Sequence, residues 1–104
     1  MNLQKQRRHE SQKLKDSARG QACTIRLPGI CNHNPETTVL CHLHGGGMGT
    51  KKSDLFAAFG CSDCHNEVDG RTMKLPGDEV HADHLEGMVR TQQYWLDNGF
   101  ITLK

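Results

Sequence analysis

The apolar residues of this chain are widely spaced, and their pattern predicts several short elements. Residues 3–18 contain no Gly or Pro and are compatible with a helix, although its apolar stripe is thin. Gly20 is expected to end this helix. Residues 23–27 favour a short strand that stops at a Pro-Gly turn, and residues 37–44 form the clearest strand pattern in the chain.

Side chains alternate between the two faces of a strand, so the strand at 37–44 has one apolar face and one histidine-bearing face. Val39, Cys41 and Leu43 share the apolar face and are expected to point into the core. His42 and His44 share the other face, which is expected to be exposed. The sequence therefore predicts an imidazole presented to solvent near the end of this strand.

The middle of the chain predicts a loop, a helical turn and a metal-binding turn. Residues 45–52 are rich in Gly and Lys and are expected to form a flexible basic loop. Asp54 is expected to cap a short helical turn that continues to Phe59. The pair Cys61-x-x-Cys64 then reads as a tight turn that opens a helix.

The C-terminal third predicts one long helix. Residues 70–80 are expected to be a loop, and residues 81–97 show helical spacing of apolar side chains. Tyr94 and Trp95 are expected to anchor this helix to the core. Asn98-Gly99 is a typical C-terminal stop, and residues 100–103 favour a short terminal strand.

The cysteine content indicates a metal site. Only 35% of the 104 residues are hydrophobic and 5% aromatic, so the core is small and another source of stability is expected. The five cysteines are an odd number, which fits disulfide pairing poorly, and the polar first residues indicate no secretory leader. We therefore expect a cytoplasmic protein, and no apolar stretch is long enough to span a membrane.

Two cysteine pairs, separated by eight and three positions, match the ligand set of a structural zinc ion: Cys23, Cys31, Cys61 and Cys64. The alternative is that these are ordinary buried thiols. A redox role needs a βαβ context that the sequence lacks. Cys41, the fifth cysteine, is expected to be a small core residue.

Positive charge is concentrated at the N-terminus. The net charge of the chain is only +1, yet residues 1–20 hold six basic and two acidic side chains. This favours a polyanion such as nucleic acid, although a solvated terminus would show the same charge. We divide the chain into a basic N-terminal arm or helix at 1–19 and one zinc-bound domain at 20–104.

The order of these motifs resembles the ββα-metal core of the HNH, or His-Me finger, endonucleases. The resemblance rests on a His-bearing strand, a Gly-rich basic loop and Cys61-x-x-Cys64-His65. More closely, residues 18–100 are similar to the YbcO-like family of small prophage-encoded proteins named as nucleases. The segments that carry this similarity are residues 23–31, Gly47-Met48-Gly49-x-Lys51 and residues 61–71.

The resemblance implies an α+β fold, a small zinc-bound ββα-metal domain with flanking N- and C-terminal helices. It also implies that His42 is the general base, since imidazole accepts a proton near neutral pH. His65 and Asp69 are four residues apart and would share a helix face, so they are candidate ligands of a catalytic Mg²⁺ or Mn²⁺. Many HNH enzymes carry an acidic or His ligand directly before the base. Cys41 occupies that position here, and His44 is a candidate substitute.

The function predicted from the sequence is metal-dependent hydrolysis of phosphodiester bonds in nucleic acid, with DNA as the expected substrate. The cationic side chains expected to contact phosphates are Lys51, Lys52, Arg7 and Arg8. Two alternatives remain open, a non-catalytic zinc-ribbon-like module that binds nucleic acid and a phage adaptor protein. His33, His81 and His84 are expected at the surface, with His84 as a weaker candidate for approaching a metal.

Overall fold

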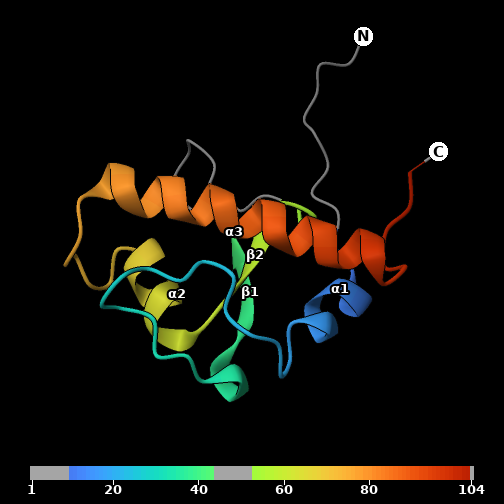
Figure 1. Ribbon diagram of the computed structural model, residues 1–104, viewed down its shortest axis with the longest axis horizontal. Helices are drawn as coiled ribbons and strands as arrows, with labels where there is room; N and C mark the ends of the chain where they lie inside the picture. Colours follow the sequence, from blue (N-terminus) through green and yellow to red (C-terminus); the bar gives the residue numbers. More distant parts are fainter. Residues whose placement is uncertain (1–9, 44–52, 104) are drawn as a thin grey trace, which may run out of the picture.

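The computed structural model describes residues 10–43 and 53–103, which form a small α+β fold (Figure 1). The elements in chain order are helix α1 (Gln12–Ser17), 3-10 helix η1 (Pro35–Thr37), strand β1 (Val39–His42), strand β2 (Ala57–Gly60), helix α2 (Ser62–Val68) and helix α3 (Gly77–Asp97). The predicted α+β class is therefore confirmed.

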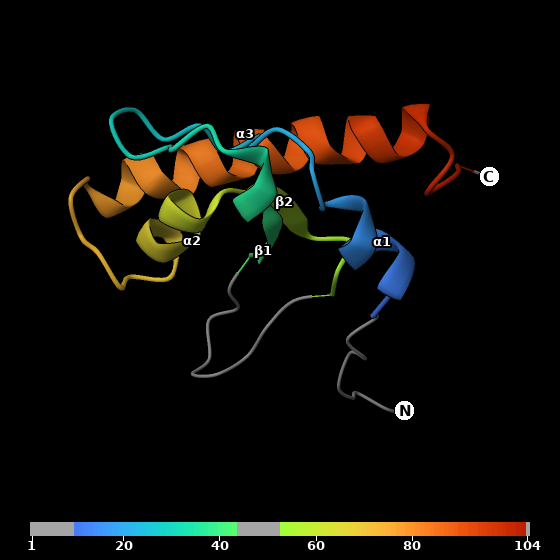
Figure 2. The same ribbon diagram turned by 90° about the horizontal axis from the view of Figure 1, so that it is seen from below.

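A two-stranded antiparallel sheet lies at the centre of the molecule. Val39 of β1 pairs with Gly60 of β2, and His42 pairs with Ala57. Helix α2 lies on one side of this hairpin and α1 on the other, while α3 runs along both (Figures 1 and 2). The hairpin thus separates two environments that share α3 as a common wall.

Each environment has its own hydrophobic cluster. The cluster on the α2 side contains the buried cysteines together with Ile25, Leu27, Ala58, Val80 and Met88. The cluster on the α1 side contains Leu14, Ala18, Leu40, Ala57, Phe59 and Trp95. Because neighbouring residues of a strand face opposite ways, Cys41 enters the first cluster and Leu40 enters the second.

This double burial corrects the expected exposure pattern of β1. Val39, expected in the core, is 44% exposed, whereas Leu40, expected on the histidine-bearing face, is 8% exposed. Residues of the α1 segment pack against the face of β1 that carries Leu40, which was expected to be exposed to solvent. Periodicity found the strand but could not show that both of its faces are covered.

The segment after the basic loop is a strand, and the predicted helical turn between Asp54 and Phe59 is wrong. Residues 57–60 pair with β1 as β2, and all four are buried. The strands expected at 23–27 and 100–103 are also wrong, because both segments are irregular. Thr24 nevertheless lies beside β2, where its backbone N–H donates to the carbonyl of Phe59 at 2.8 Å.

The C-terminal helix is confirmed and is one turn longer than predicted. Helix α3 begins at Gly77, inside the segment expected to be loop, and the chain turns away at Gly99 with a positive φ of 77°. Trp95 is fully buried, and its indole N–H donates to the hydroxyl of Ser17 in α1 at 2.8 Å. The predicted anchoring role of Trp95 is thus confirmed.

Helix α1 is an integral part of the described fold. Leu14 and Ala18 are buried against Trp95, and Ser11 caps the helix by accepting a hydrogen bond from the N–H of Leu14. None of the helices in the described part of the chain is long and apolar enough to cross a membrane.

Candidate metal centre and catalytic site

Four cysteine thiols converge at the junction of α2 and the 23–31 loop. The sulfur atoms of Cys23, Cys31, Cys61 and Cys64 all lie within 4.8 Å of one another. Four Zn–S bonds of ~2.3 Å in a tetrahedron require sulfurs about 3.8 Å apart. The Cys61 and Cys31 sulfurs are 3.9 Å apart, so the site has the dimensions to hold a metal ion such as zinc.

Backbone N–H groups point at the sulfurs of Cys23 and Cys61. The N–H of Arg26 lies 3.5 Å from the Cys23 sulfur, and the N–H groups of Asn32 and Cys64 lie 3.5 and 3.4 Å from the Cys61 sulfur. Arg26 has a positive φ of 56°. The hydrogen bond from the Cys64 thiol, followed by such backbone N–H groups, outweighs burial and lowers the pKa of Cys23 to about 4.

Cys41 is fully buried in the same cluster but lies outside the group of four. Burial is the largest cause that raises the pKa of its thiol well above the ordinary value. A neutral, buried thiol acts as a small apolar side chain, as its position on the strand indicates.

On the opposite face of the hairpin, His42 pairs with a buried carboxylate. Its Nε2 lies 2.7 Å from Oδ1 of Asp54, whose side chain is 1% exposed. The second oxygen of Asp54 accepts the backbone N–H of Ser11 at 2.6 Å and lies 3.9 Å from the ammonium of Lys15. Burial alone would raise the pKa of Asp54, but the hydrogen bonds from His42 and Ser11 and the charge of Lys15 lower it overall.

His42 opens into a cavity of about 330 Å³ between β1 and α1. Its side chain is 12% exposed, so the expectation of an exposed histidine is wrong: Asp54 contacts the ring, and residues of α1 form the facing wall of the cavity. The other lining residues are Gln12, Lys15, Asp16, Arg19, Thr38, Val39 and Leu40. The imidazole therefore lines a small cavity that also has a polar helical wall.

His65 on α2 and Asp69, which caps the C-terminus of this helix, lie together, as their spacing predicts. His65 Nε2 is 3.3 Å from Asp69 Oδ2, and Arg71 approaches the same carboxylate at 3.8 Å. Within residues 10–43 and 53–103, the cysteine quartet is the one group of three or more potential ligands that gathers closely enough for a metal. His65 and Asp69 thus offer two potential ligand atoms for a metal ion.

The structure does not place His42 on the face of β1 that meets α2. Cys41 occupies that face, and His42 points to the α1 side, where its partner is Asp54. The remaining predicted site residues, His44, Lys51, Lys52, Arg7 and Arg8, lie outside the described residues.

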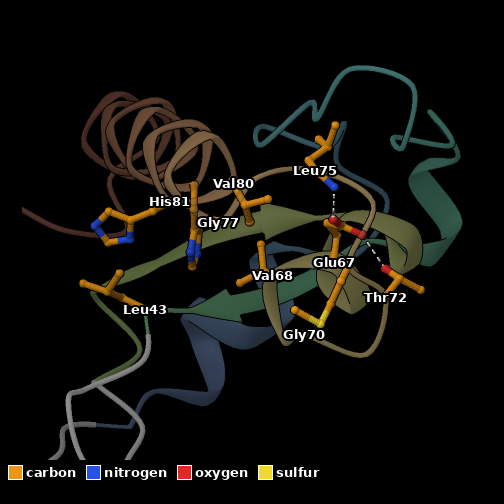
Figure 3. A pocket seen from close by; sticks show the side chains of 11 residues that line it. Leu43, Glu67, Val68, Gly70, Thr72, Leu75, Gly77, Val80 and His81 are labelled. Carbon is orange, nitrogen blue, oxygen red and sulfur yellow. Dashed lines mark hydrogen bonds between the residues drawn. The ribbon is translucent and has the colours of Figure 1, made fainter.

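A second hollow, of about 310 Å³, lies between α2 and the first turns of α3 (Figure 3). Glu67 forms one end of it and holds the 70–77 loop by accepting hydrogen bonds from Thr72 and from the backbone N–H groups of Lys74 and Leu75. His84, expected at the surface, is 2% exposed, and its Nε2 lies 2.9 Å from the carbonyl oxygen of Cys41. This histidine therefore connects α3 to β1.

Two carboxylates with structural roles carry no recognisable signal in the sequence. Asp54 is a partner of His42 and not the predicted helix cap, and Glu67 holds the 70–77 loop. Both are charged residues in segments of mixed polarity, and their partners lie in parts of the chain that local patterns do not connect. Asp54 reaches Ser11 and His42, which are 43 and 12 positions away.

Comparison with known proteins identifies close relatives. The family model described as "Putative nuclease YbcO" matches residues 12–100. The chain is 47% identical over 91 residues to "Putative nuclease YbcO" of Escherichia coli (strain K12), covering 85% of this chain and 95% of the relative. The "Putative nuclease ybcO" of Enterobacteria phage 82 matches with the same identity and coverage. A solved structure described as that of "a putative bacteriophage protein" from E. coli K-12 is 45% identical, with a TM-score of 0.72, covering 82% of this chain and 98% of the other.

Proposed function

Because the chain belongs to the YbcO family, whose relatives are named as nucleases, we propose that it is a metal-dependent endonuclease that hydrolyses phosphodiester bonds in nucleic acid. DNA is the proposed substrate. A relative encoded by Enterobacteria phage 82 supports a phage setting for this activity. We also propose that the core has the HNH, or ββα-metal, architecture, formed by β1, β2 and α2.

The observation that carries the proposal is the contact between His42 and Asp54. A carboxylate with a lowered pKa is ionised near neutral pH and accepts the Nε2–H of the imidazole. This hydrogen bond fixes the tautomer in which Nδ1 carries the lone pair. An imidazole held in this way is suited to take the proton from a water that attacks phosphorus.

His65 and Asp69 are the proposed protein ligands of a divalent ion. One nitrogen and one carboxylate oxygen on adjacent turns of α2 fit Mg²⁺ or Mn²⁺, and the remaining positions stay open to water and phosphate oxygens. When bound, the ion would neutralise charge on the phosphate and stabilise the leaving oxygen. His42 is the last residue of β1, so the proposal requires the scissile phosphate to lie across this strand end.

The four cysteines have a structural role in this proposal. A closed tetrahedral set leaves no position for substrate, which is typical of structural zinc. The ion would join the 23–31 loop to the start of α2 and add folding free energy to a small core.

The experiment is a cleavage assay with purified, zinc-loaded protein. Supercoiled, single-stranded and branched DNA are incubated with Mg²⁺, Mn²⁺ or no added divalent ion, and zinc content is measured before and after. We expect cleavage that depends on the added ion and is lost in His42→Ala. His81→Ala, which removes an exposed imidazole from α3, is the matched control and should keep wild-type activity.

Two results would contradict the proposal. The first is equal cleavage by wild type and His42→Ala, with both proteins folded and zinc-loaded. The second is a wild-type protein that binds nucleic acid but cleaves no substrate with any divalent ion. The second result would favour the zinc-ribbon-like binding module.

A further inference from the structure

Helix α1 and the turn after it present one polar face to the His42 cavity. Gln12, Lys15, Asp16 and Arg19 all line this cavity and are spaced at three, four and seven residues, which places them on one side of the helix. Leu14 and Ala18 occupy the other side and are buried against the core. The orientation of α1 is therefore fixed by packing, and its polar face is held toward His42.

Two cations on this face form ion pairs with exposed carboxylates, and one of them, Lys15, also lies near buried Asp54. The Lys15 ammonium lies 3.0 Å from Glu10, which is 57% exposed, and 3.9 Å from buried Asp54. The Arg19 guanidinium is 81% exposed and lies 3.9 Å from Asp16, which is itself 53% exposed. Exposed pairs of this kind contribute about 0–1 kcal/mol, so a competing anion displaces them at little cost.

Asp16 is the acidic residue on this face, and its carboxylate already has two partners. The side-chain amide of Gln12 donates to Asp16 Oδ1 at 2.9 Å. This is the same oxygen that approaches Arg19, so its charge is shared between an amide and a guanidinium. The Arg19 side chain is 81% exposed, so its guanidinium remains accessible from solvent.

From this arrangement we propose that α1 is the phosphate-binding wall of the His42 site. Lys15 and Arg19 would hold phosphodiester groups of the nucleic acid next to the proposed base. The inference rests on the proposed nuclease function, since it assigns the residues that hold the substrate at that site. Arg19 is the principal contact, because guanidinium presents several donors in a plane and binds phosphate in a bidentate way.

The test compares two charge-removing variants of α1. Arg19→Gln removes the proposed contact, and its side chain is too exposed to affect folding. Lys13→Gln removes the same charge from α1 itself, but the Lys13 ammonium lies 5.4 Å from the Phe100 ring centroid, and Lys13 does not line the cavity. Net charge is therefore matched between the two variants.

Affinity for a duplex oligonucleotide is measured against salt concentration, without divalent ions so that no cleavage occurs. Loss of one phosphate contact lowers the slope of log K against log salt by about 0.9, which makes the affinity loss between 50 and 200 mM salt about threefold smaller. We expect this change in Arg19→Gln and no comparable change in Lys13→Gln. Lys15→Gln should resemble Arg19→Gln, provided that its melting temperature confirms a folded protein.

The outcomes separate this inference from the proposed function. If Arg19→Gln and Lys13→Gln have equal slopes, the phosphate wall is overturned, whether or not the wild type cleaves DNA. If only Arg19→Gln has a reduced slope, the phosphate wall is supported, even if the wild type cleaves nothing and the nuclease proposal fails.

Discussion

Replacing Asp54 by Asn tests the most specific claim about the site, because it changes one atom and keeps the shape of the side chain. The backbone N–H of Ser11 can only donate, so the Asn oxygen is expected to keep that hydrogen bond. The Asn amide then faces His42 Nε2, which must accept instead of donating. The imidazole proton moves to Nδ1, the nitrogen that the proposed mechanism needs as the base.

The expected effect on the rate is large. General-base catalysis contributes about 100- to 10,000-fold, and an imidazole in the wrong tautomer loses most of that contribution. The expected effect on stability is smaller. One hydrogen bond to a charged acceptor, worth about 1.5–3 kcal/mol, becomes a neutral one worth about 0.5–1.5 kcal/mol. A net loss of about 1–2 kcal/mol lowers the melting temperature of a domain this size by about 5–15 °C.

The assay combines cleavage rates at saturating substrate with unfolding in urea at pH 7, where the cysteine thiolates can hold zinc. Because the pKa of Asp54 is lowered in the fold, its stabilisation is fully present at this pH and would be lost only below about pH 3.8, as the pH falls through the folded pKa. Asp97→Asn makes the same change on the exposed end of α3 and should alter neither quantity. A folded Asp54→Asn protein with the wild-type cleavage rate would refute the reasoning.

Three further changes test the metal centre, the packing and the loop. Cys61→Ser should lose its zinc, as measured by elemental analysis, and should be unfolded, as measured by circular dichroism. Cys41→Ala should keep one zinc per chain, and loss of zinc from this variant would contradict the ligand assignment. Gly87→Ala should lower stability by about 1–3 kcal/mol in urea unfolding, because its Cβ would lie 3.0 Å from the Cα of Ile25; an unchanged midpoint would show that the helix shifts freely. The hydroxyl of Thr72 and backbone N–H groups lower the pKa of Glu67, so the stabilisation that this carboxylate gives the 70–75 loop is lost as the pH falls below about 4.5 through the folded pKa. The amide protection factors of the loop, corrected for the pH dependence of intrinsic exchange, should fall over this range, and a Glu67→Gln protein should lack this pH dependence.

The grouping of four cysteines that could hold a metal ion was predictable from the sequence because much of its information is local. The identity of cysteine as a ligand and the spacing of Cys61 and Cys64 are properties of a few adjacent residues. Helix α3 was predictable for a similar reason, since its apolar spacing repeats over several turns. Such signals do not depend on the rest of the fold.

Strand β2 could not be predicted from its own residues. They are small because neighbouring segments pack closely against the strand. The sequence Ala57-Ala58-Phe59-Gly60 has little intrinsic preference for a strand. A Cβ on Gly60 would lie 2.9 Å from the Cδ1 of Ile25 and 3.2 Å from the Cβ of Cys41. Close packing between the hairpin and the 23–27 segment therefore selects small residues, and only the folded structure reveals that requirement.

The basic N-terminal segment shows why charge alone could not assign its role. Residues 1–20 carry the charge surplus, which is compatible with an arm that reaches toward a polyanion. The described part of this segment also supplies Leu14 to the core, a hydroxyl to the indole of Trp95 and a backbone N–H to Asp54. Deleting residues 1–18 would therefore remove packing and a partner of the His42–Asp54 pair together with the charges, and weaker binding would have two causes. Substitutions on the exposed face of α1 remove charge while leaving its buried face in place, so they separate electrostatic binding from folding in a way that truncation cannot.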